Sequence, residues 1–323
     1  MALDLKAKLD DVVTPDLKKK VAAWWHGVDV EDLDWPQEEL VEALDEVDDA
    51  DDGEESVDPF TAKYDLSHFI VVSQEIWGKG FHSPGGPEFM DEWGQQLSLN
   101  KDKSSAFFGS GLGGQAREIS KTTGSWITGY DRIQELVEEG ADQANMAGMA
   151  KNATSEIYDP AIIEFSDEKF HAVLAKEEFV FVEDKARLIE QIGSSLKKNG
   201  LFMFTDYVWV DEEVSVTDAE AMFGTLLGQP RLWREQDYVS KLESCDLDIH
   251  VNEDFSDRYV DFISSGWARY RNIVADIKNG PESDQEKARL LHLVADAAEH
   301  WTRIATSLGA GHIQVRRFLA RKV

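Results

Sequence analysis

The sequence is poor in cysteine and in basic residues, and it has no long apolar run. Its one cysteine, Cys245, excludes an internal disulfide and any zinc site built on several cysteines. No apolar stretch approaches the roughly 18 residues of a membrane-spanning helix. The first residues, MALDLKAKLDDVV, lack the apolar core of a secretory signal. We therefore expect a cytoplasmic protein without a membrane span.

Basic residues are outnumbered almost two to one. Lysine and arginine total 33 against 63 aspartates and glutamates, which gives a formal net charge of −30. Binding to nucleic acid requires basic side chains that displace phosphate counterions, so a nucleic-acid partner is excluded. The acidity is compatible with a cationic substrate, and equally with a role in solubility alone.

Motifs for metal binding and for several hydrolytic mechanisms are also absent. The eight histidines show neither an H-x₃-H nor an H-E-x-x-H spacing, and no metal is expected. The chain has no G-x-S-x-G nucleophile elbow and no phosphate-binding loop with its lysine. Metallohydrolase, serine-hydrolase and nucleotide-triphosphatase chemistry are therefore not indicated.

Three regions are expected along the chain. Residues 1–40 form a helical N-terminal segment, in which Val21, Trp24, Trp25 and Val28 follow helical spacing. Residues 41–58 contain ten acidic positions out of 18 and no basic one, which indicates a solvated linker. Residues 59–323 form the main domain.

In the main domain, strands and helices alternate. Short apolar strands are expected at SSAFFG, SWITGYD, TSEIYD, FHAVLAKE and LFMFTDYVWV, with helices between most of them, and HIQVRRFLARKV ends the chain as a last strand. Two long helical stretches are expected near 256–278 and 284–307. This alternation predicts an α/β fold with a doubly wound, mostly parallel sheet.

A glycine-rich turn follows the first of these strands. The sequence GSGLGG, residues 109–114, stands between a strand and a helix, and Asp131 follows 22 residues after Gly109 at the end of the next strand. Glycines let the backbone approach a ligand, and the helix N-terminus offers free amide donors. A carboxylate at this distance can accept hydrogen bonds from both hydroxyls of a ribose. The pattern predicts a nucleoside-binding cradle.

The spacing of these glycines resembles motif I of the class I S-adenosylmethionine (SAM) dependent methyltransferases. Together with WGKGFHSPGG (77–86), FTDY (204–207) and the closing RFLARKV, it resembles the phosphoethanolamine N-methyltransferase group and related small-molecule methyltransferases. The resemblance covers roughly residues 60 to 323. It implies a Rossmann-like sheet whose last strand is antiparallel, with SAM as cofactor and S-adenosylhomocysteine as product.

The resemblance also implies roles for individual residues. The cofactor-binding positions would be Trp77, Ser83, Gly109, Ser110, Gly111, Gly113, Asp131 and Asp159. Substrate contact and catalysis would involve His82, Glu177, Asp206 and Tyr207. Recognition of a substrate phosphate would need basic side chains, and those available by position are Lys79, Lys176, Arg231 and Arg234.

Three positions depart from the family pattern. Phe107 holds the place of the motif I acid, His171 that of an aspartate, and Phe181 that of a histidine that takes part in catalysis. Two functions therefore remain open. The chain is a methyltransferase acting on a small molecule, for which the resemblance implies an amine or phospho-base. Alternatively it is a catalytically degenerate subunit that scaffolds or regulates a partner, such as a second methyltransferase-like chain or a second copy of itself.

Overall fold

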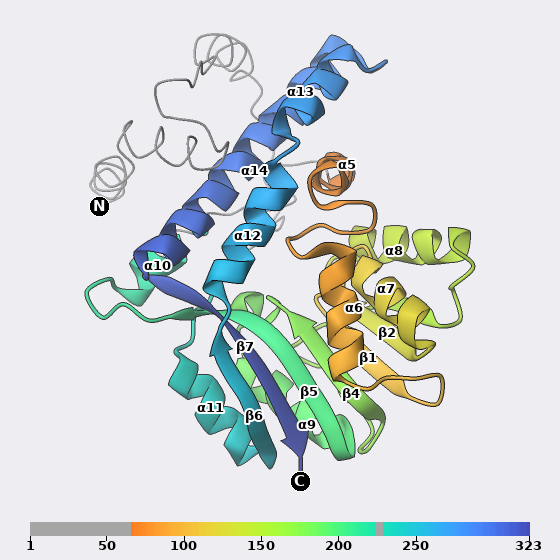
Figure 1. Cartoon of the computed structure of the whole chain (residues 1–323), viewed down its shortest axis with the longest axis vertical. Coiled ribbons are helices and arrows are strands. Elements are labelled where there is room, and N and C mark those ends of the chain that lie inside the picture. The colour runs from red at the N-terminus through yellow and green to blue at the C-terminus, as the bar shows by residue number, and fades with distance from the viewer. Residues whose placement is uncertain (1–65, 222, 224–228) are drawn as a thin grey trace.

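The computed structural model describes residues 66–221, 223 and 229–323 (Figure 1). The expected helical segment 1–40 and acidic linker 41–58 lie outside these residues, as does the start of the main domain at residue 59. Among the helices that are described, none is long and apolar enough to cross a membrane.

One sheet organises the described residues. Its strands are β1 (Ser104–Phe108), β2 (Trp126–Asp131), β3 (Ala153–Ile157), β4 (Phe170–Lys176), β5 (Leu196–Trp209), β6 (Leu247–Asp254) and β7 (Ile313–Lys322). They lie in the order β3-β2-β1-β4-β5-β7-β6. Strands β1 to β5 pair with one another in parallel, and β7 is antiparallel to both β5 and β6. The expected doubly wound, mostly parallel sheet with an antiparallel last strand is confirmed.

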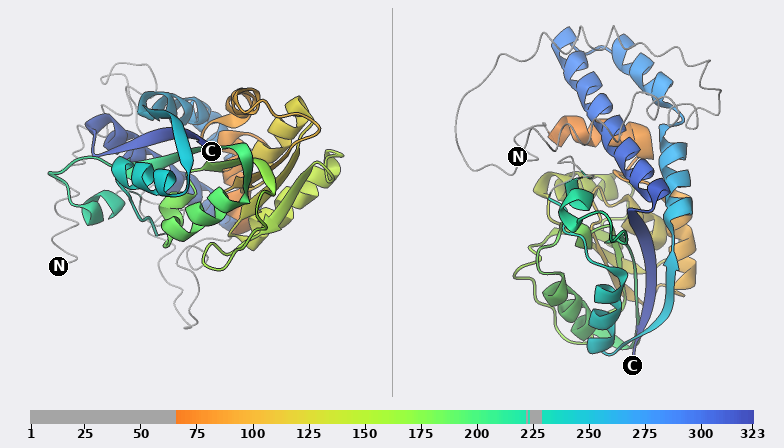
Figure 2. Two further views of the ribbon diagram at one scale, coloured as in Figure 1. Left: turned by 90° about the horizontal axis from the view of Figure 1, so that it is seen from below. Right: turned by 90° about the vertical axis from the view of Figure 1, so that its left-hand side faces the viewer.

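Helices cover both faces of this sheet (Figures 1 and 2). One face packs on α6 (Gly86–Gln96), α7 (Gly114–Thr123) and α8 (Gln134–Met146), and the other on α9 (Lys185–Ser195) and α11 (Glu235–Ser244). Because strand side chains alternate between faces, a strand covered on both sides must be apolar throughout. In β1, Phe107 stacks on Trp93 of α6, while Phe108 stacks on Tyr130 in the opposite core.

A third group of helices lies beyond the carboxyl ends of the parallel strands. It comprises α5 (Leu66–Trp77), α12 (Ser256–Trp267), α13 (Tyr270–Asn279) and α14 (Asp284–Ala310), which rise from one end of the sheet in Figures 1 and 2. Trp77 of α5 joins them, because its ring meets the edges of Trp267 and Trp301 at centroid distances of 6.5 and 5.0 Å. These helices cover the edge of the sheet where parallel α/β folds bind ligands.

Two features differ from the sequence-based expectation. Strand β6 was not expected, although Leu247, Ile249 and Val251 alternate with polar residues as in an edge strand. One helix was expected over 256–278, but the structure has two, because the helix ends at Trp267 and a new one begins at Tyr270. The short elements η2 (Phe179–Phe181) and α10 (Val216–Ala221) complete the described fold.

Candidate active site

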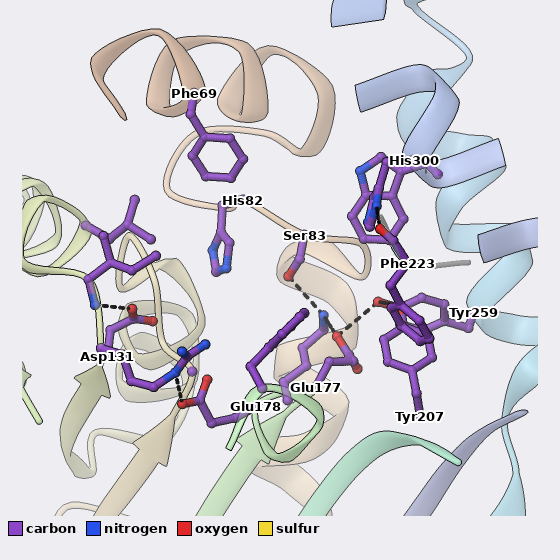
Figure 3. A pocket seen from close by; sticks show the side chains of 17 residues that line it. Phe69, His82, Ser83, Asp131, Glu177, Glu178, Tyr207, Phe223, Tyr259 and His300 are labelled. Carbon is purple, nitrogen blue, oxygen red and sulfur yellow. Dashed lines mark hydrogen bonds and ion pairs between the residues drawn. The ribbon is translucent and has the colours of Figure 1, made fainter. Parts of the chain in front are cut away.

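A cavity of about 60 Å³ lies at the carboxyl ends of β1, β2, β4 and β5, under the helices described above (Figure 3). The residues around it come from the ends of these strands and the turns that follow them, and from α5, α12 and α14 among the covering helices. They are Phe69, His82, Ser83, Gly109, Asp131, Arg132, Ile133, Leu136, Lys176, Glu177, Glu178, Phe181, Tyr207, Phe223, Tyr259, His300 and Trp301.

The glycine loop lies on one side of this cavity. Gly109, Gly111 and Gly113 all adopt positive φ angles, of 69°, 47° and 71°, which the turn from β1 into α7 requires. The amide of Gly111 donates to Oδ2 of Asp131 at 2.7 Å, and the amide of Ile133 donates to Oδ1 at 3.1 Å. These two bonds hold the carboxylate of Asp131 at the cavity wall, where it is 6% exposed.

The loop between α5 and α6 closes over the glycine loop. Its Gly80 carbonyl accepts a hydrogen bond from the amide of Gly114 at 2.9 Å, so it occupies a donor at the N-terminus of α7. The His82 ring packs directly on Gly111, since a methyl group built there would lie 2.1 Å from the imidazole. Burial lowers the pKa of His82 to about 4, although Asp131 opposes the shift. Its buried Nδ1 has no hydrogen-bond partner in the described part of the chain.

The close contact between His82 and Gly111 predicts that a substitution at Gly111 lowers the stability of the protein. Gly111→Ala is expected to destabilise the protein by about 2–4 kcal/mol, because the added methyl group strains a positive φ and collides with His82. The matched control is Gly148→Ala, which has a φ of 68° and open space around the added carbon. Urea unfolding measures both, and His82→Ala is expected to relieve the excess cost at Gly111. Equal losses at the two glycines would contradict the packing of His82 on the loop.

A buried polar chain lies on the other side of the cavity. The ammonium of Lys176 is paired with Oε2 of Glu177 and donates to Ser83 Oγ at 3.1 Å. Glu177 also accepts from Thr205 Oγ1 at 2.7 Å and from the Tyr259 hydroxyl at 3.0 Å. The Tyr207 hydroxyl extends the chain by donating to the Tyr259 oxygen at 3.0 Å. Glu177 adopts a φ of 46°, an uncommon conformation for a residue with a side chain.

A second buried ion pair lies between this chain and the glycine loop. Glu178 accepts from Arg132 Nε at 2.8 Å and from the Tyr158 hydroxyl. Burial raises the pKa of Glu178, and the Arg132 cation opposes the shift. The guanidinium of Arg132 also lies 5.6 Å from the centre of the Phe181 ring. Phe181 therefore stands at the cavity wall as an apolar residue against a paired cation.

Six of the residues that the sequence assigns to the site line the cavity. These are His82, Ser83, Gly109, Asp131, Glu177 and Tyr207. Gly111 and Gly113 stand in the loop behind the wall, Gly111 under His82 and Gly113 at the start of α7. Sequence reasoning missed Phe69, Tyr259, His300 and Trp301, because they come from α5, α12 and α14 and follow no local motif.

Three residues assigned to cofactor binding lie away from the cavity. The carboxylate of Asp159 is exposed and accepts from the amide of Ala161 at 2.8 Å, as a turn requires. Trp77 packs among Trp267, Trp301 and Gly266. Ser110 is fully buried and points towards the backbone of β2 at Gly129. In this geometry none of the three lines the cavity.

Asp206, assigned to the substrate, faces the opposite side of the sheet from Tyr207. Adjacent strand residues point to opposite faces, so only one of the two can reach the cavity. Asp206 accepts hydrogen bonds from the Tyr238 hydroxyl on α11 and from the Val180 amide, the latter at 3.2 Å. Burial raises its pKa to about 7, although Tyr238 and the nearby Lys185 oppose the shift. Its place is the core beneath η2.

The raised pKa of Asp206 predicts a pH-dependent stability. The folded protein keeps the proton up to about pH 7, whereas an unfolded chain releases it near pH 4, so this contribution to stability falls as pH rises between them. Asp206→Asn removes the titration. Its stability relative to the wild type is expected to rise by about 2–3 kcal/mol from about pH 5 to about pH 8. Urea midpoints measure this, with Asp159→Asn as the exposed control. A difference that does not change with pH would contradict the assignment.

Across the described ranges, no group of three or more histidine, cysteine, aspartate or glutamate side chains could hold a metal ion.

Comparison with known proteins agrees with this architecture. The methyltransferase domain family matches residues 107–204. A sterol 24-C-methyltransferase from Yarrowia lipolytica is 30% identical over 152 residues, which cover 46% of this chain and 40% of the relative. Phosphoethanolamine N-methyltransferase 3 from Arabidopsis thaliana is 24% identical over 138 residues, covering 43% and 28%. The chain thus spans less than half of the length of either relative.

A solved structure extends the comparison over more of the chain. Phosphoethanolamine N-methyltransferase 2 from Haemonchus contortus, in complex with S-adenosyl-L-methionine, superimposes with a TM-score of 0.68 at 17% sequence identity. The superposition covers 84% of this chain and 61% of that one. The chain therefore shares the fold of the class I SAM-dependent methyltransferases, and its residues 107–204 match the methyltransferase domain family.

Proposed function

We propose that the chain binds SAM and transfers its methyl group to a small-molecule acceptor. The observation that carries the proposal is one cavity in which Asp131 and the glycine loop meet the buried chain of Lys176, Glu177 and Tyr259. It lies at the strand ends where α/β folds bind their ligands. The names of the relatives point in the same direction, since they include methyltransferases acting on a sterol and on phosphoethanolamine.

The residues around the glycine loop suit SAM. The carboxylate of Asp131 is oriented by two amides and keeps lone pairs for the ribose hydroxyls. Ile133 and Leu136 offer apolar surface beside it for a flat base. The wall carries three carboxylates, of Asp131, Glu177 and Glu178, against the two cations of Arg132 and Lys176. This excess of one negative charge favours a cationic ligand.

The loop that carries His82 must move for the cofactor to enter. The His82 ring occupies the surface of Gly111, where the backbone would otherwise lie open to the cofactor. The unpartnered Nδ1 of His82 is the kind of buried polar atom that a bound ligand can satisfy. In the closed position the loop excludes water from the cavity, which protects the reaction.

SAM, when bound, supplies a methyl group on a positively charged sulfur. The protein then contributes mainly position, because an acceptor held in line with the methyl group needs little further activation. Tyr207, Tyr259 and Ser83 line the space beyond the glycine loop, where they can orient an acceptor. The resemblance to the phosphoethanolamine group suggests an amine or phospho-base for that place.

The second candidate is a catalytically degenerate subunit that scaffolds a partner, such as another methyltransferase-like chain. It is favoured by Phe107, which replaces the motif I acid with a fully buried core residue, and by Phe181 at the position of the catalytic histidine. The third departure, His171, accepts a hydrogen bond from the Ser104 amide at 3.1 Å and so has a role within the sheet. A positioned base contributes about 10²–10⁴-fold, so loss of the histidine slows transfer without abolishing it.

A turnover assay separates the two candidates. The purified chain is incubated with SAM and a panel of amines, phospho-bases, alcohols and phenols, and S-adenosylhomocysteine is quantified. Acceptor-dependent formation of S-adenosylhomocysteine supports the methyltransferase. Tight binding of SAM without turnover on any class of acceptor supports the degenerate subunit.

A further inference from the structure

The part of the cavity beyond Lys176 is lined almost entirely by aromatic rings. We call this part the acceptor chamber, and its lining residues are Tyr207, Phe223, Tyr259, His300 and Trp301. Figure 3 shows Tyr207, Phe223, Tyr259 and His300 gathered on one side of the cavity, with Asp131 on the other and His82 between them. The chamber is therefore distinct from the glycine-loop side that suits SAM.

The charged groups beside the acceptor chamber are already neutralised by the protein. The Lys176 ammonium is bonded to Glu177 and Ser83. Both oxygens of Glu177 are occupied, Oε1 by Thr205 and Oε2 by Lys176 and Tyr259. A substrate phosphate would have to take Lys176 from Glu177, which would leave the buried carboxylate without its partner. A substrate ammonium would meet a carboxylate whose charge Lys176 already neutralises.

The other basic residues available by position do not supply a free cation. Arg132 lines the cavity but is paired with Glu178. Arg234 is paired with Glu212 and lies 4.0 Å over the Trp209 ring, away from the cavity. Of Lys79, Lys176, Arg231 and Arg234, only Lys176 is part of the described cavity wall. Burial also lowers the pKa of His300 to about 4, so its ring is neutral.

A smaller apolar cavity adjoins the acceptor chamber between α5 and α14. It has a volume of about 10 Å³, and it shares Phe69, His82 and Trp301 with the main cavity. The rest of its wall is mostly hydrocarbon and consists of Val72, Ser73, Ile76, Trp77, Leu293 and Ala297. Apolar surface therefore continues from the chamber into the space between two helices, and Phe69 and Trp301 stand at the junction.

His300 offers a polar atom to a ligand in the chamber. His300 Nδ1 lies 2.6 Å from the carbonyl oxygen of Phe223, which can only accept, so Nδ1 must carry the proton. Nε2 then has a free lone pair, and no hydrogen bond to it is made by any residue within 66–221, 223 and 229–323. An acceptor lone pair at the wall of an apolar chamber favours a ligand with an uncharged hydrogen-bond donor.

From these observations we infer that the acceptor is an uncharged molecule with a hydrocarbon body and one hydroxyl or similar donor group, and not a phospho-base. The body lies against the aromatic wall and extends between α5 and α14, and the donor meets Nε2 of His300. This inference rests on the proposed function of the site, because it names the class of acceptor that the methyltransferase would take.

Three probes with one tail and different head groups test the inference. Octanol, octylamine and octyl phosphate are titrated into the full-length chain, and tryptophan fluorescence reports binding beside Trp301. Phosphoethanolamine is the fourth probe. Octanol is expected to bind about tenfold or more tightly than each charged probe, because none of the described residues around the chamber offers them a free counter-charge. S-adenosylhomocysteine is titrated in parallel, so that failure of the cofactor site is seen separately.

Two variants locate the probe. His300→Phe keeps the aromatic shape but removes Nε2, and it is expected to weaken octanol binding about fivefold to tenfold. Ala297→Leu fills the space between α5 and α14 and is also expected to weaken octanol binding. Both should bind S-adenosylhomocysteine like the wild type, which shows that they are folded. The inference is overturned if a charged probe binds as tightly as octanol, if no probe binds, or if both variants bind octanol unchanged.

Discussion

Replacing Asp131 with alanine is expected to weaken SAM binding by about 10- to 100-fold. The change removes the acceptor for the ribose hydroxyls, and such hydrogen bonds are worth about 1–3 kcal/mol when the group left behind is buried and unpaired. It also leaves the amides of Gly111 and Ile133 without the carboxylate that they now share, although the amides of Gly109 and Ser110 still bind the Tyr130 carbonyl of β2. Calorimetric titration measures the effect.

The control for Asp131 is Asp159, the other aspartate that the sequence assigns to cofactor binding. Asp159 is exposed and bonded to the amide of Ala161, so Asp159→Ala is expected to leave SAM affinity within about twofold of the wild type. Asp131→Asn keeps an acceptor at the same place and should lie between the two. If Asp131→Ala bound SAM normally, the ribose assignment would be lost.

Removing the charge of Glu177 is expected to give the largest loss of stability. Glu177→Gln keeps the shape of the side chain but leaves the Lys176 ammonium uncompensated, in a position where the lysine side chain is 2% exposed. Breaking a buried ion pair at one partner typically lowers the free energy of unfolding by about 3–5 kcal/mol. Chemical denaturation measures the change.

A double variant and a surface pair complete this test. Lys176→Met combined with Glu177→Gln removes both charges and is expected to recover most of the lost stability, since no buried charge remains. The surface pair of Lys121 and Glu118 joins positions three apart on α7, and the lysine side chain is 67% exposed. Glu118→Gln should therefore change stability by less than about 0.5 kcal/mol. Similar losses at Glu177 and Glu118 would show that the pair at the cavity is not buried in solution.

The fold was largely predictable because its signals are local. Each parallel strand is a short apolar run followed by a turn, and a run that is buried on both faces differs clearly from the helices around it. The strand β6 was missed because an edge strand carries polar residues on one face, and LDIHVNED shows only a weak alternation. The two residues between α12 and α13 are Ala268 and Arg269, and neither residue type signals the end of a helix in the sequence.

The candidate site was predictable only in part, for physical reasons. The glycine loop and Asp131 are joined by a strand and a helix of fixed length, so their spacing in sequence reflects their distance in space. Tyr259 and His300 reach the cavity from α12 and α14, which are distant in sequence from the glycine loop. No local sequence pattern predicts that they line the same cavity. Asp206 and Tyr207 were assigned together, although strand alternation allows only one of two neighbours to face a given side.

The structure shows what surrounds Phe107 and Phe181, two of the residues that depart from the family pattern. Phe107 is a core residue stacked on Trp93, so the strand before the glycine loop is stabilised by packing where the family has an acid. Phe181 adds an apolar ring to the cavity wall beside the Arg132–Glu178 pair. Of the two changes, only that at Phe181 makes the cavity wall more apolar, and this agrees with the uncharged acceptor proposed above.

Calorimetric titration of the full-length protein with SAM and with S-adenosylhomocysteine tests the central claim most directly. The account predicts that both bind with micromolar affinity, that the loop carrying His82 opens to admit them, and that Asp131→Ala abolishes most of the signal. Absence of binding by either ligand at millimolar concentration would contradict it. The glycine loop would then be the retained shell of a cofactor site, and the search would turn to a partner protein.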